Sequence, residues 1–333
     1  RALVPRTATT LAIAVALVLT SCAPLARSVA VGARPAVPVL AAGAVWVPNS
    51  GDGTIAIVDL RSMTVRRTVT LADPGAYLSS GCVYGNGFKI SEHNFPMGYF
   101  SARACEVPTT AVLAGGSVWV ARNDQAALER LDPRTGSSLG TVPIAAQPWA
   151  MAPQRDIIWI TDYFGGQVLR FDTRTATVTN RVKNIPGGPT GITATSDAVY
   201  VVSSSDPAIS RLDPDTARIV ATRQLGTRPL PVAFGAGLVW VRDEGEGSLR
   251  WLDASDLTER GSVKVGSFFG RDGLDAIAFD GEGIWVCSLG LRRVNARTKA
   301  IDRELPVDCI AAVFGYGALW VLDLTGRLAR VAI

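Results

Sequence analysis

The sequence of 333 residues predicts an all-β fold, a seven-bladed β-propeller with four-stranded blades, because three features recur in a fixed register and no helical period interrupts them. One is an aromatic residue flanked by β-branched or apolar residues, at spacings of 73, 40, 41, 40, 45 and 35: Trp46, Trp119, Trp159, Tyr200, Trp240, Trp285 and Trp320. Another is a proline eleven residues before the aromatic in five of the seven units: Pro35, Pro108, Pro148, Pro189 and Pro229, with Leu274 and Cys309 in the other two. The third is an aspartate thirteen residues after the aromatic in five units: Asp59, Asp132, Asp172, Asp213 and Asp253.

Each unit is expected to hold four short strands, A to D. In the third unit, strand-forming runs cover 156–160, 167–171 and 177–182, and they are separated by Gly, Asp, Pro and Ser residues. Four strands in so few residues, repeated side by side, are typical of a propeller blade. Because a blade cannot cover its own faces, we expect the aromatic of strand B to pack between neighbouring blades as a core residue.

The last unit predicts how the ring closes. It ends after its third strand, so the seventh blade needs an outer strand from elsewhere in the chain. Residues 28–32 resemble the outer strands at 222–226 and 261–266. We therefore expect the N-terminal strand to complete the seventh blade, which removes the exposed edge that an open sheet would carry.

Composition and charge exclude several classes of protein. With 48% hydrophobic and 19% charged residues, the chain is neither disordered nor a coiled coil. The 33 Lys and Arg residues exceed the 29 Asp and Glu residues by only four and are scattered, so we expect no nucleic-acid partner. His93 is the single histidine, which excludes any catalytic mechanism or metal site that needs two histidines.

The N-terminus predicts export and anchoring. Arg1 and Arg6 precede an apolar run at 11–19, which is shorter than the roughly 20 residues that span a bilayer and is typical of a secretory signal. The run ends in Leu-Thr-Ser-Cys at 19–22, which resembles the bacterial lipobox. We expect a signal peptide at 1–21, a lipidated Cys22, a linker at 22–27 and the propeller at 28–333, held outside the cytoplasm on the cell envelope or in the periplasm. The alternative is an ordinary signal in which Cys22 is incidental.

Two repeat families share these motifs. Residues 45–59, Val-Trp-Val-Pro-Asn-Ser-Gly-Asp-Gly-Thr-Ile-Ala-Ile-Val-Asp, resemble the repeat of the YVTN-type propellers of bacterial and archaeal surfaces. The Arg-Leu-Asp-Pro stretches at 130–133 and 211–214 are similar to those of streptogramin lyase. The lyase resemblance implies histidine and glutamate acting with a divalent metal, but no repeat loop here contains a histidine, and His93 matches no motif of that family. We therefore assign no catalytic residue, no metal ligand and no cofactor from the resemblance.

Candidate binding residues lie on one face of the predicted ring. The repeated Asp-Pro-Arg-Thr-Gly stretch is expected to form the hairpin between strands C and D, with a structural role for its aspartate. The loops from B to C and from D to the next A instead surround the mouth of the central channel. Their candidate ligand-binding residues are Arg122, Asp124, Asp162, Tyr163, Arg242, Asp243, Glu244 and Asp323.

The spacing of 73 between the first two aromatics indicates an insertion at 73–107 on the same face. It is rich in aromatic residues and adds Tyr84 and His93 to the candidates. An insertion of this length is expected to be either a recognition loop or a passive plug over the channel.

The remaining four cysteines predict two disulfides in an oxidising compartment. Cys82 and Cys105 bracket most of the insertion, whereas Cys287 and Cys309 are placed on the same face of blades six and seven. Four buried free thiols are the alternative.

These observations predict a lipid-anchored binding or scaffolding module of the cell envelope, whose partner is an envelope protein, a glycan or a small molecule. The alternatives are a lyase-like or lactonase-like enzyme with a metal at the channel mouth, and a purely structural surface protein.

Overall fold

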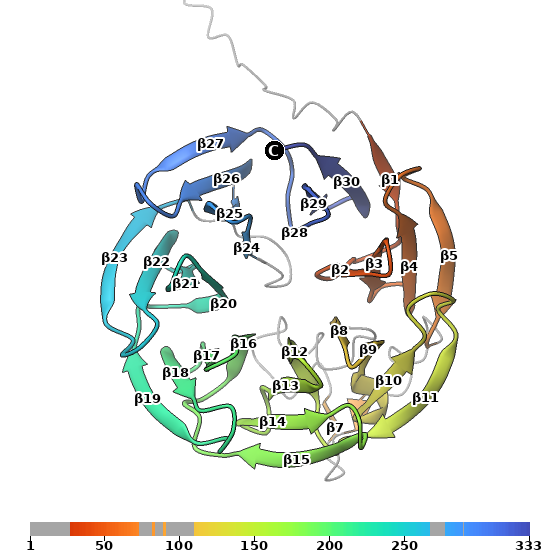
Figure 1. The fold of residues 1–333 in the computed structure, drawn as a ribbon, viewed down its shortest axis with the longest axis horizontal. Helices are drawn as coiled ribbons and strands as arrows, with labels where there is room; N and C mark the ends of the chain where they lie inside the picture. Colours follow the sequence, from red (N-terminus) through yellow and green to blue (C-terminus); the bar gives the residue numbers. More distant parts are fainter. Residues whose placement is uncertain (1–26, 73–81, 84–88, 91–109, 267–276, 289) are drawn as a thin grey trace, which may run out of the picture.

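The computed structural model describes residues 27–72, 82–83, 89–90, 110–266, 277–288 and 290–333. These residues form seven four-stranded antiparallel sheets, arranged as blades in a closed ring (Figure 1). The predicted all-β fold and its seven blades are confirmed. No helix among the described residues is both long and apolar enough to cross a bilayer.

Six blades follow the chain, each with its strands in the order A to D from the axis outward. Blade 1 contains β2 (Val39–Ala41), β3 (Ala44–Asn49), β4 (Thr54–Asp59) and β5 (Val65–Thr70). Blade 2 contains β8 (Ala111–Ala114), β9 (Ser117–Arg122), β10 (Ala127–Leu131) and β11 (Ser138–Pro143), with the 3-10 turn η1 (Asn123–Gln125) between β9 and β10. Blade 3 contains β12 (Pro148–Gln154), β13 (Ile157–Asp162), β14 (Gln167–Asp172) and β15 (Thr177–Val182).

Blades 4 to 6 repeat this order. Blade 4 contains β16 (Pro189–Ala194), β17 (Val199–Ser203), β18 (Ala208–Leu212) and β19 (Ile219–Gln224). Blade 5 contains β20 (Pro229–Gly235), β21 (Leu238–Asp243), β22 (Ser248–Asp253) and β23 (Glu259–Lys264). Blade 6 contains β24 (Ile277–Phe279), β25 (Gly283–Ser288), β26 (Gly290–Asn295) and β27 (Ile301–Leu305). A separate hairpin of β6 (Cys82–Val83) and β7 (Lys89–Ile90) lies within the inserted residues.

Blade 7 closes the ring with both ends of the described chain. Its inner strands are β28 (Ala311–Gly315), β29 (Ala318–Leu322) and β30 (Arg327–Val331), and its outer strand is β1 (Ser28–Ala30). Ser28 lies opposite Ala329 in the antiparallel pair. The Val31 amide donates to the Gly326 carbonyl at 2.9 Å. Closure by the N-terminal strand is confirmed, with a paired segment of three residues within the expected 28–32.

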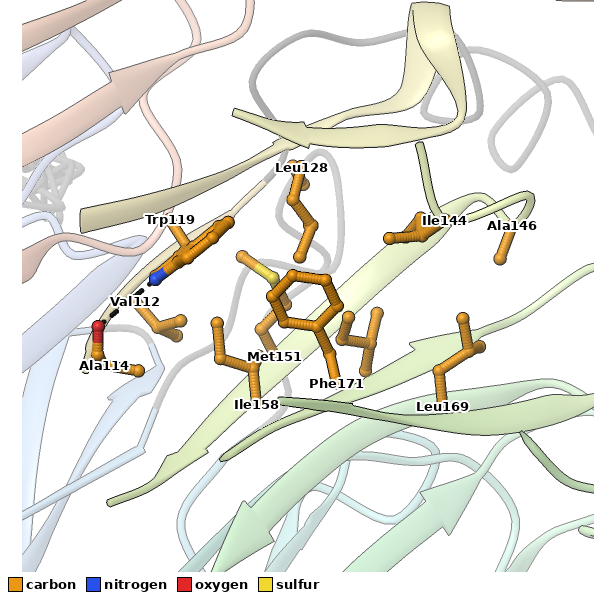
Figure 2. Close-up of a cluster of buried hydrophobic side chains, with 12 residues drawn as sticks. Val112, Ala114, Trp119, Leu128, Ile144, Ala146, Met151, Ile158, Leu169 and Phe171 are labelled. Carbon is orange, nitrogen blue, oxygen red and sulfur yellow. Dashed lines mark hydrogen bonds between the residues drawn. The ribbon is translucent and has the colours of Figure 1, made fainter. Parts of the chain in front are cut away.

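The core consists of the strand B aromatics, which pack between blades as expected. All seven are 2% exposed or less. Figure 2 shows Trp119 of blade 2 beside Phe171 and Ile158 of blade 3. Its indole donates to the Ala114 carbonyl at 3.2 Å, so the polar atom of this buried ring is satisfied within its own blade. The aromatics therefore hold neighbouring blades together.

The repeated aspartates close the C–D turns. The Asp132 carboxylate accepts the amides of Arg134 and Thr135, both at 2.8 Å, and Asp59 and Asp213 accept the corresponding pairs of amides. These backbone hydrogen bonds hold the pKa of Asp132 below its usual value. The structural role expected for the repeat carboxylates is confirmed by these bonds.

The disulfide between Cys287 and Cys309 joins blades 6 and 7, with 5.2 Å between the two Cα atoms. Both cysteines are buried in the core cluster that these blades share. This predicted pairing is confirmed. The predicted Cys82–Cys105 pairing lies outside the described residues, because Cys105 is not among them.

Candidate functional site

The turns between strands B and C and the connections between strands D and A lie on one face, called here the B–C face. In blades 1 to 6, strand B ends at this face with a buried polar residue: Asn49, Arg122, Asp162, Ser203, Asp243 and Ser288. The repeat positions differ in charge and size from blade to blade. The turns that follow are four residues long in blades 1 to 5, and this short length brings their side chains close to the strand ends.

Three of the predicted carboxylates on this face hold turns together. Asp162 accepts the Gly165 amide at 2.9 Å, and Asp323 accepts the amides of Thr325 and Arg327 at 2.8 and 3.0 Å. Asp243 is fully buried and accepts the amides of Thr227, Arg228 and Glu246 at 3.0 to 3.2 Å. These bonds explain why carboxylates stand at these positions before any ligand is considered.

Arg122 and Asp124, both predicted candidates, form one ion-pair cluster with Glu129 in blade 2. The Arg122 guanidinium donates two bonds to Asp124, at 3.0 and 2.8 Å, and one to Glu129 at 2.6 Å. Burial opposes the charged form of Arg122, but the bonds to both carboxylates outweigh it and raise the pKa of the guanidinium. Asp124 itself is exposed at the rim, so the cluster presents to solvent a carboxylate that is held by Arg122.

The candidates of blade 5 form a second charged cluster. Arg242 is fully buried and donates to the Gly266 carbonyl at 3.2 Å, and Glu244 lies 3.5 Å from Arg228. Arg250, which the sequence did not single out, lies 3.4 Å from Asp243 and pairs with Glu246 at 2.6 Å and Glu259 at 2.7 Å. Its place within β22, away from the loops, explains why a search of loop residues missed it.

Tyr163 belongs to an aromatic cluster between blades 3 and 4. Its ring centroid is 5.0 Å from those of both Trp149 and Phe164, and its hydroxyl hydrogen-bonds to the Ser205 hydroxyl at 2.9 Å. Gly188 makes this contact possible, because a Cβ atom there would lie 2.6 Å from both the Tyr163 ring and the Ser205 oxygen. Trp149 and Phe164 were missed. Trp149 directly follows the repeat proline. The equivalent residues of the other described blades are Ala36, Thr190, Leu230 and Ile310, so an aromatic residue at this position is unusual and could have identified Trp149 from the sequence.

A buried glutamine lies two residues before Trp149. Gln147 is 4% exposed, and neither atom of its amide has a hydrogen-bond partner within the described part of the chain. The Ser203 hydroxyl, at the end of β17 in blade 4, is likewise buried without a partner there. Buried polar groups in folded proteins are nearly always satisfied, so such atoms indicate a place where a ligand or water completes the bonding. Together with the aromatic cluster they define the blade 3–4 sector: Gln147, Trp149, Tyr163, Phe164, Ser203 and Ser205.

The predicted carboxylates do not converge. No group of three or more His, Cys, Asp or Glu residues within the described ranges is arranged to bind a metal ion. Asp124, Asp162 and Asp243 instead serve three different blades. The candidates Tyr84 and His93 and the predicted lipidation site Cys22 lie outside the described residues.

Comparisons with known proteins show the fold of this chain. No protein-family model matches it, and no curated protein matches it in sequence. A chain in the crystal structure of a mitotic checkpoint complex is similar in structure, with a TM-score of 0.71 and 9% identity over 100% of this chain and 98% of that chain. A chain of the hydrazine synthase of Kuenenia stuttgartiensis is similar with a TM-score of 0.68 and 9% identity, covering 90% of this chain and 95% of that chain. At this identity the likeness concerns the propeller fold alone.

Proposed function

We propose that this propeller is an extracytoplasmic scaffold, anchored by a lipid on Cys22, that binds an envelope partner through the B–C face. The blade 3–4 sector carries the proposal. It combines three aromatic rings in mutual contact with buried polar atoms of Gln147 and Ser203 that have no partner among the described residues. Binding surfaces are typically built in this way, from aromatic area with a few convergent polar groups.

The two charged clusters support binding on the same face. The Arg122–Asp124–Glu129 cluster and the Arg250–Asp243–Glu246–Glu259 cluster are held by ion pairs of 2.6 to 3.4 Å, so their side chains are ordered before a partner arrives. Preorganised groups lose little side-chain entropy on association. Variation of the same turn from blade to blade gives the face a distinct pattern around the ring, which a single partner can recognise.

The location outside the cytoplasm is supported by two independent features. One is the signal-like segment at 1–21, which ends at Cys22 in a lipobox-like motif. The other is the Cys287–Cys309 disulfide, a bond that persists mainly in oxidising compartments. A lipid anchor would hold the ring at the membrane while the B–C face remains available to a partner.

The anchor is tested by fractionating cells that produce the wild-type chain or Cys22→Ser. The wild type is expected to partition into the detergent phase, with mass spectrometry showing acylated Cys22 as the first mature residue. Cys22→Ser is expected to retain its signal or to be released into the medium. Cleavage at another position with unmodified Cys22 in the wild type would refute the anchor and leave the binding proposal standing.

The binding face is tested by crosslinking in intact cells and isolation of the tagged propeller. The wild type is expected to yield a discrete adduct, and the variants Tyr163→Ala and Gln147→Leu are expected to reduce it at least about tenfold, because each removes an anchor of the blade 3–4 sector. Leu139→Ala, an exposed residue of β11 on the outer wall, is the matched control and should leave the adduct unchanged. An adduct retained in both sector variants, with their folds intact by circular dichroism, would contradict the proposal.

A further inference from the structure

A pocket of about 580 Å³ lies at the seam between blades 7 and 1, on the face opposite the B–C turns. Figure 1 shows these blades side by side where the ring closes. Blade 7 contributes Tyr316, Trp320 and Arg330, and blade 1 contributes Gly43, Asp59, Leu60, Arg61 and Arg66. Three guanidinium groups thus face one carboxylate in a space within the size range of small-molecule sites.

Arg330 occupies a position of strand C that repeats from blade to blade. In five blades the residue of strand C that pairs with the strand B aromatic is an arginine: Arg130, Arg170, Arg211, Arg293 and Arg330. Three of them donate hydrogen bonds to oxygen atoms nearby. Arg130 donates to Ser117 at 2.8 Å, Arg170 to the Pro214 carbonyl of the next blade at 3.3 Å, and Arg293 to Asp280 at 2.7 Å.

Arg330 differs, because no described residue supplies an oxygen acceptor to its guanidinium. The guanidinium carbon lies over the Trp320 ring, 5.9 Å from its centroid. Strand β1 also ends its pairing at Ala329, so no described residue of the outer strand lies opposite Arg330. The short outer strand therefore leaves this arginine exposed at the pocket wall.

The other two arginines of the pocket have distinct roles. Arg66 is held in place, because it pairs with Asp59 at 2.6 Å and donates to the Gly43 carbonyl at 3.0 Å. The guanidinium of Arg61 is exposed and forms no ion pair with any carboxylate of the described chain. Asp59 is thus neutralised by Arg66, and the charges of Arg61 and Arg330 remain uncompensated at the pocket.

Tyr316 completes the pocket with an aromatic surface. It occupies the A–B turn four residues before the strand B aromatic, where the other blades carry Ala42, Gly115, Arg155, Ser196, Ala236 and Gly281. Its φ of 53° is unfavourable for a bulky side chain, and the residue is 57% exposed. The Gly43 amide donates to the Tyr316 hydroxyl at 3.3 Å across the seam, which orients the ring along the pocket. The positive φ is shared by the same turn position at Ala42, Arg155 and Ala236, so the feature that distinguishes Tyr316 is its exposed aromatic ring at the pocket rim.

We propose that this seam pocket binds a small organic oxyanion, a carboxylate or a phosphate monoester with a flat ring. Its oxyanion group lies between Arg61 and Arg330, and its ring packs on Tyr316. Two guanidinium groups suit either oxyanion through charge-assisted hydrogen bonds. The site is independent of the proposed binding at the B–C face, because the two faces share no residue.

The proposal is tested by calorimetric titration of the purified full-length chain with phenyl phosphate, benzoate and inorganic phosphate. Saturable binding of at least one ring-bearing probe is expected, with a Kd on the order of 1 mM or tighter. Arg330→Gln and Arg61→Gln should each weaken it at least about tenfold. Tyr316→Ala should weaken phenyl phosphate or benzoate more than inorganic phosphate, because only the former offer a ring.

Arg223→Gln is the matched control, since Arg223 is an exposed arginine of outer strand β19 outside the pocket, and it should leave the affinity unchanged. Arg330→Lys keeps the positive charge and should retain part of the binding. This variant shows whether the Arg330→Gln result comes from the lost charge or from misfolding. Preference for phenyl phosphate or for benzoate identifies the natural oxyanion, and either preference supports the site. Absence of saturable binding for both ring-bearing probes would overturn the proposal, as would an equal loss in Arg223→Gln.

Discussion

The two faces of the ring use polar residues in different ways. On the C–D face, five aspartates accept the amide two residues later, and four of them also accept the next amide. On the B–C face, the six buried strand ends carry four different residue types, and their hydrogen bonding differs from blade to blade. A residue is repeated where the turn itself requires it. Where several polar residues satisfy the turn equally well, the sequence diverges from blade to blade.

Blade 7 is the exception among the C–D turns, because its outer strand β1 is not joined to β30 by a turn. Its stability should therefore depend most strongly on the N-terminal strand. A chain that starts at Ala33 should lose roughly 3 kcal/mol or more of unfolding free energy relative to one that starts at Arg27. It loses the burial of Val31, which is 7% exposed, and the hydrogen bonds of the β1–β30 pair. Urea unfolding measures the difference. Equal midpoints would mean that β1 is an appendage and does not close the ring.

The Cys287–Cys309 disulfide should make a large contribution to stability on the B–C side. Replacing both cysteines by alanine should cost about 3 kcal/mol, because the bond closes a loop of 22 residues in the unfolded chain. A reducing agent should then lower the Tm of the wild type more than that of the double variant. If the reductant affects both chains equally, another disulfide carries the effect.

A matched pair of carboxylates tests the two faces directly. Asp172 accepts two turn amides in a C–D turn, whereas Asp206, in the B–C turn of blade 4, is exposed and its carboxylate accepts no hydrogen bond from the described residues. Asp172→Ala should therefore lower the Tm by about 2–4 °C, and Asp206→Ala should change it by less than about 1 °C. Thermal unfolding followed by circular dichroism compares the two. A larger effect of Asp206→Ala would contradict the account, in which a carboxylate stabilises a turn by accepting its amides.

The C–D turns should also make stability depend on acid. Hydrogen bonds from the Ser255 hydroxyl and amide, and then from Arg260, lower the pKa of Asp253 to about 2, and backbone amides lower the pKa values of Asp132 and Asp213. Because folded-state pKa values are depressed, this stability is present above a pH of about 4 and is lost as the pH falls through the folded-state values. The Tm should fall between about pH 4 and pH 2. Asp253→Asn should show a slightly smaller fall, and a fall as large as that of the wild type would remove Asp253 from the account.

The ring and its closure could be predicted because they depend on periodic features. Trp46 and its equivalents, the repeat aspartates and the strand at 28–32 keep a fixed register, and the same register places Cys287 and Cys309 near each other. Propeller packing repeats the same contact at every seam, so a spacing in the sequence corresponds directly to a position in the structure.

The candidate site was predictable only as a set of loops. Asp162, Asp243 and Asp323 lie on the expected face, but whether a loop carboxylate serves a turn or a ligand depends on hydrogen-bond geometry, which spacing does not show. Gln147 becomes notable only once its burial is known. Tyr316 could be recognised in the sequence, because the other A–B turns carry small or polar residues at its position. Its role as a binding residue can be inferred only from the pocket across the seam.

Site-specific photo-crosslinking in intact cells tests most directly whether the B–C face is the binding surface. A photoreactive amino acid is placed in turn at Asp124 and Asp206 on that face, and at Leu139 and Val220 on the exposed outer strands β11 and β19. We predict one discrete adduct from both B–C positions and none from the outer-strand positions. Adducts of equal yield from Leu139 or Val220, or no adduct from either B–C position, would contradict the account.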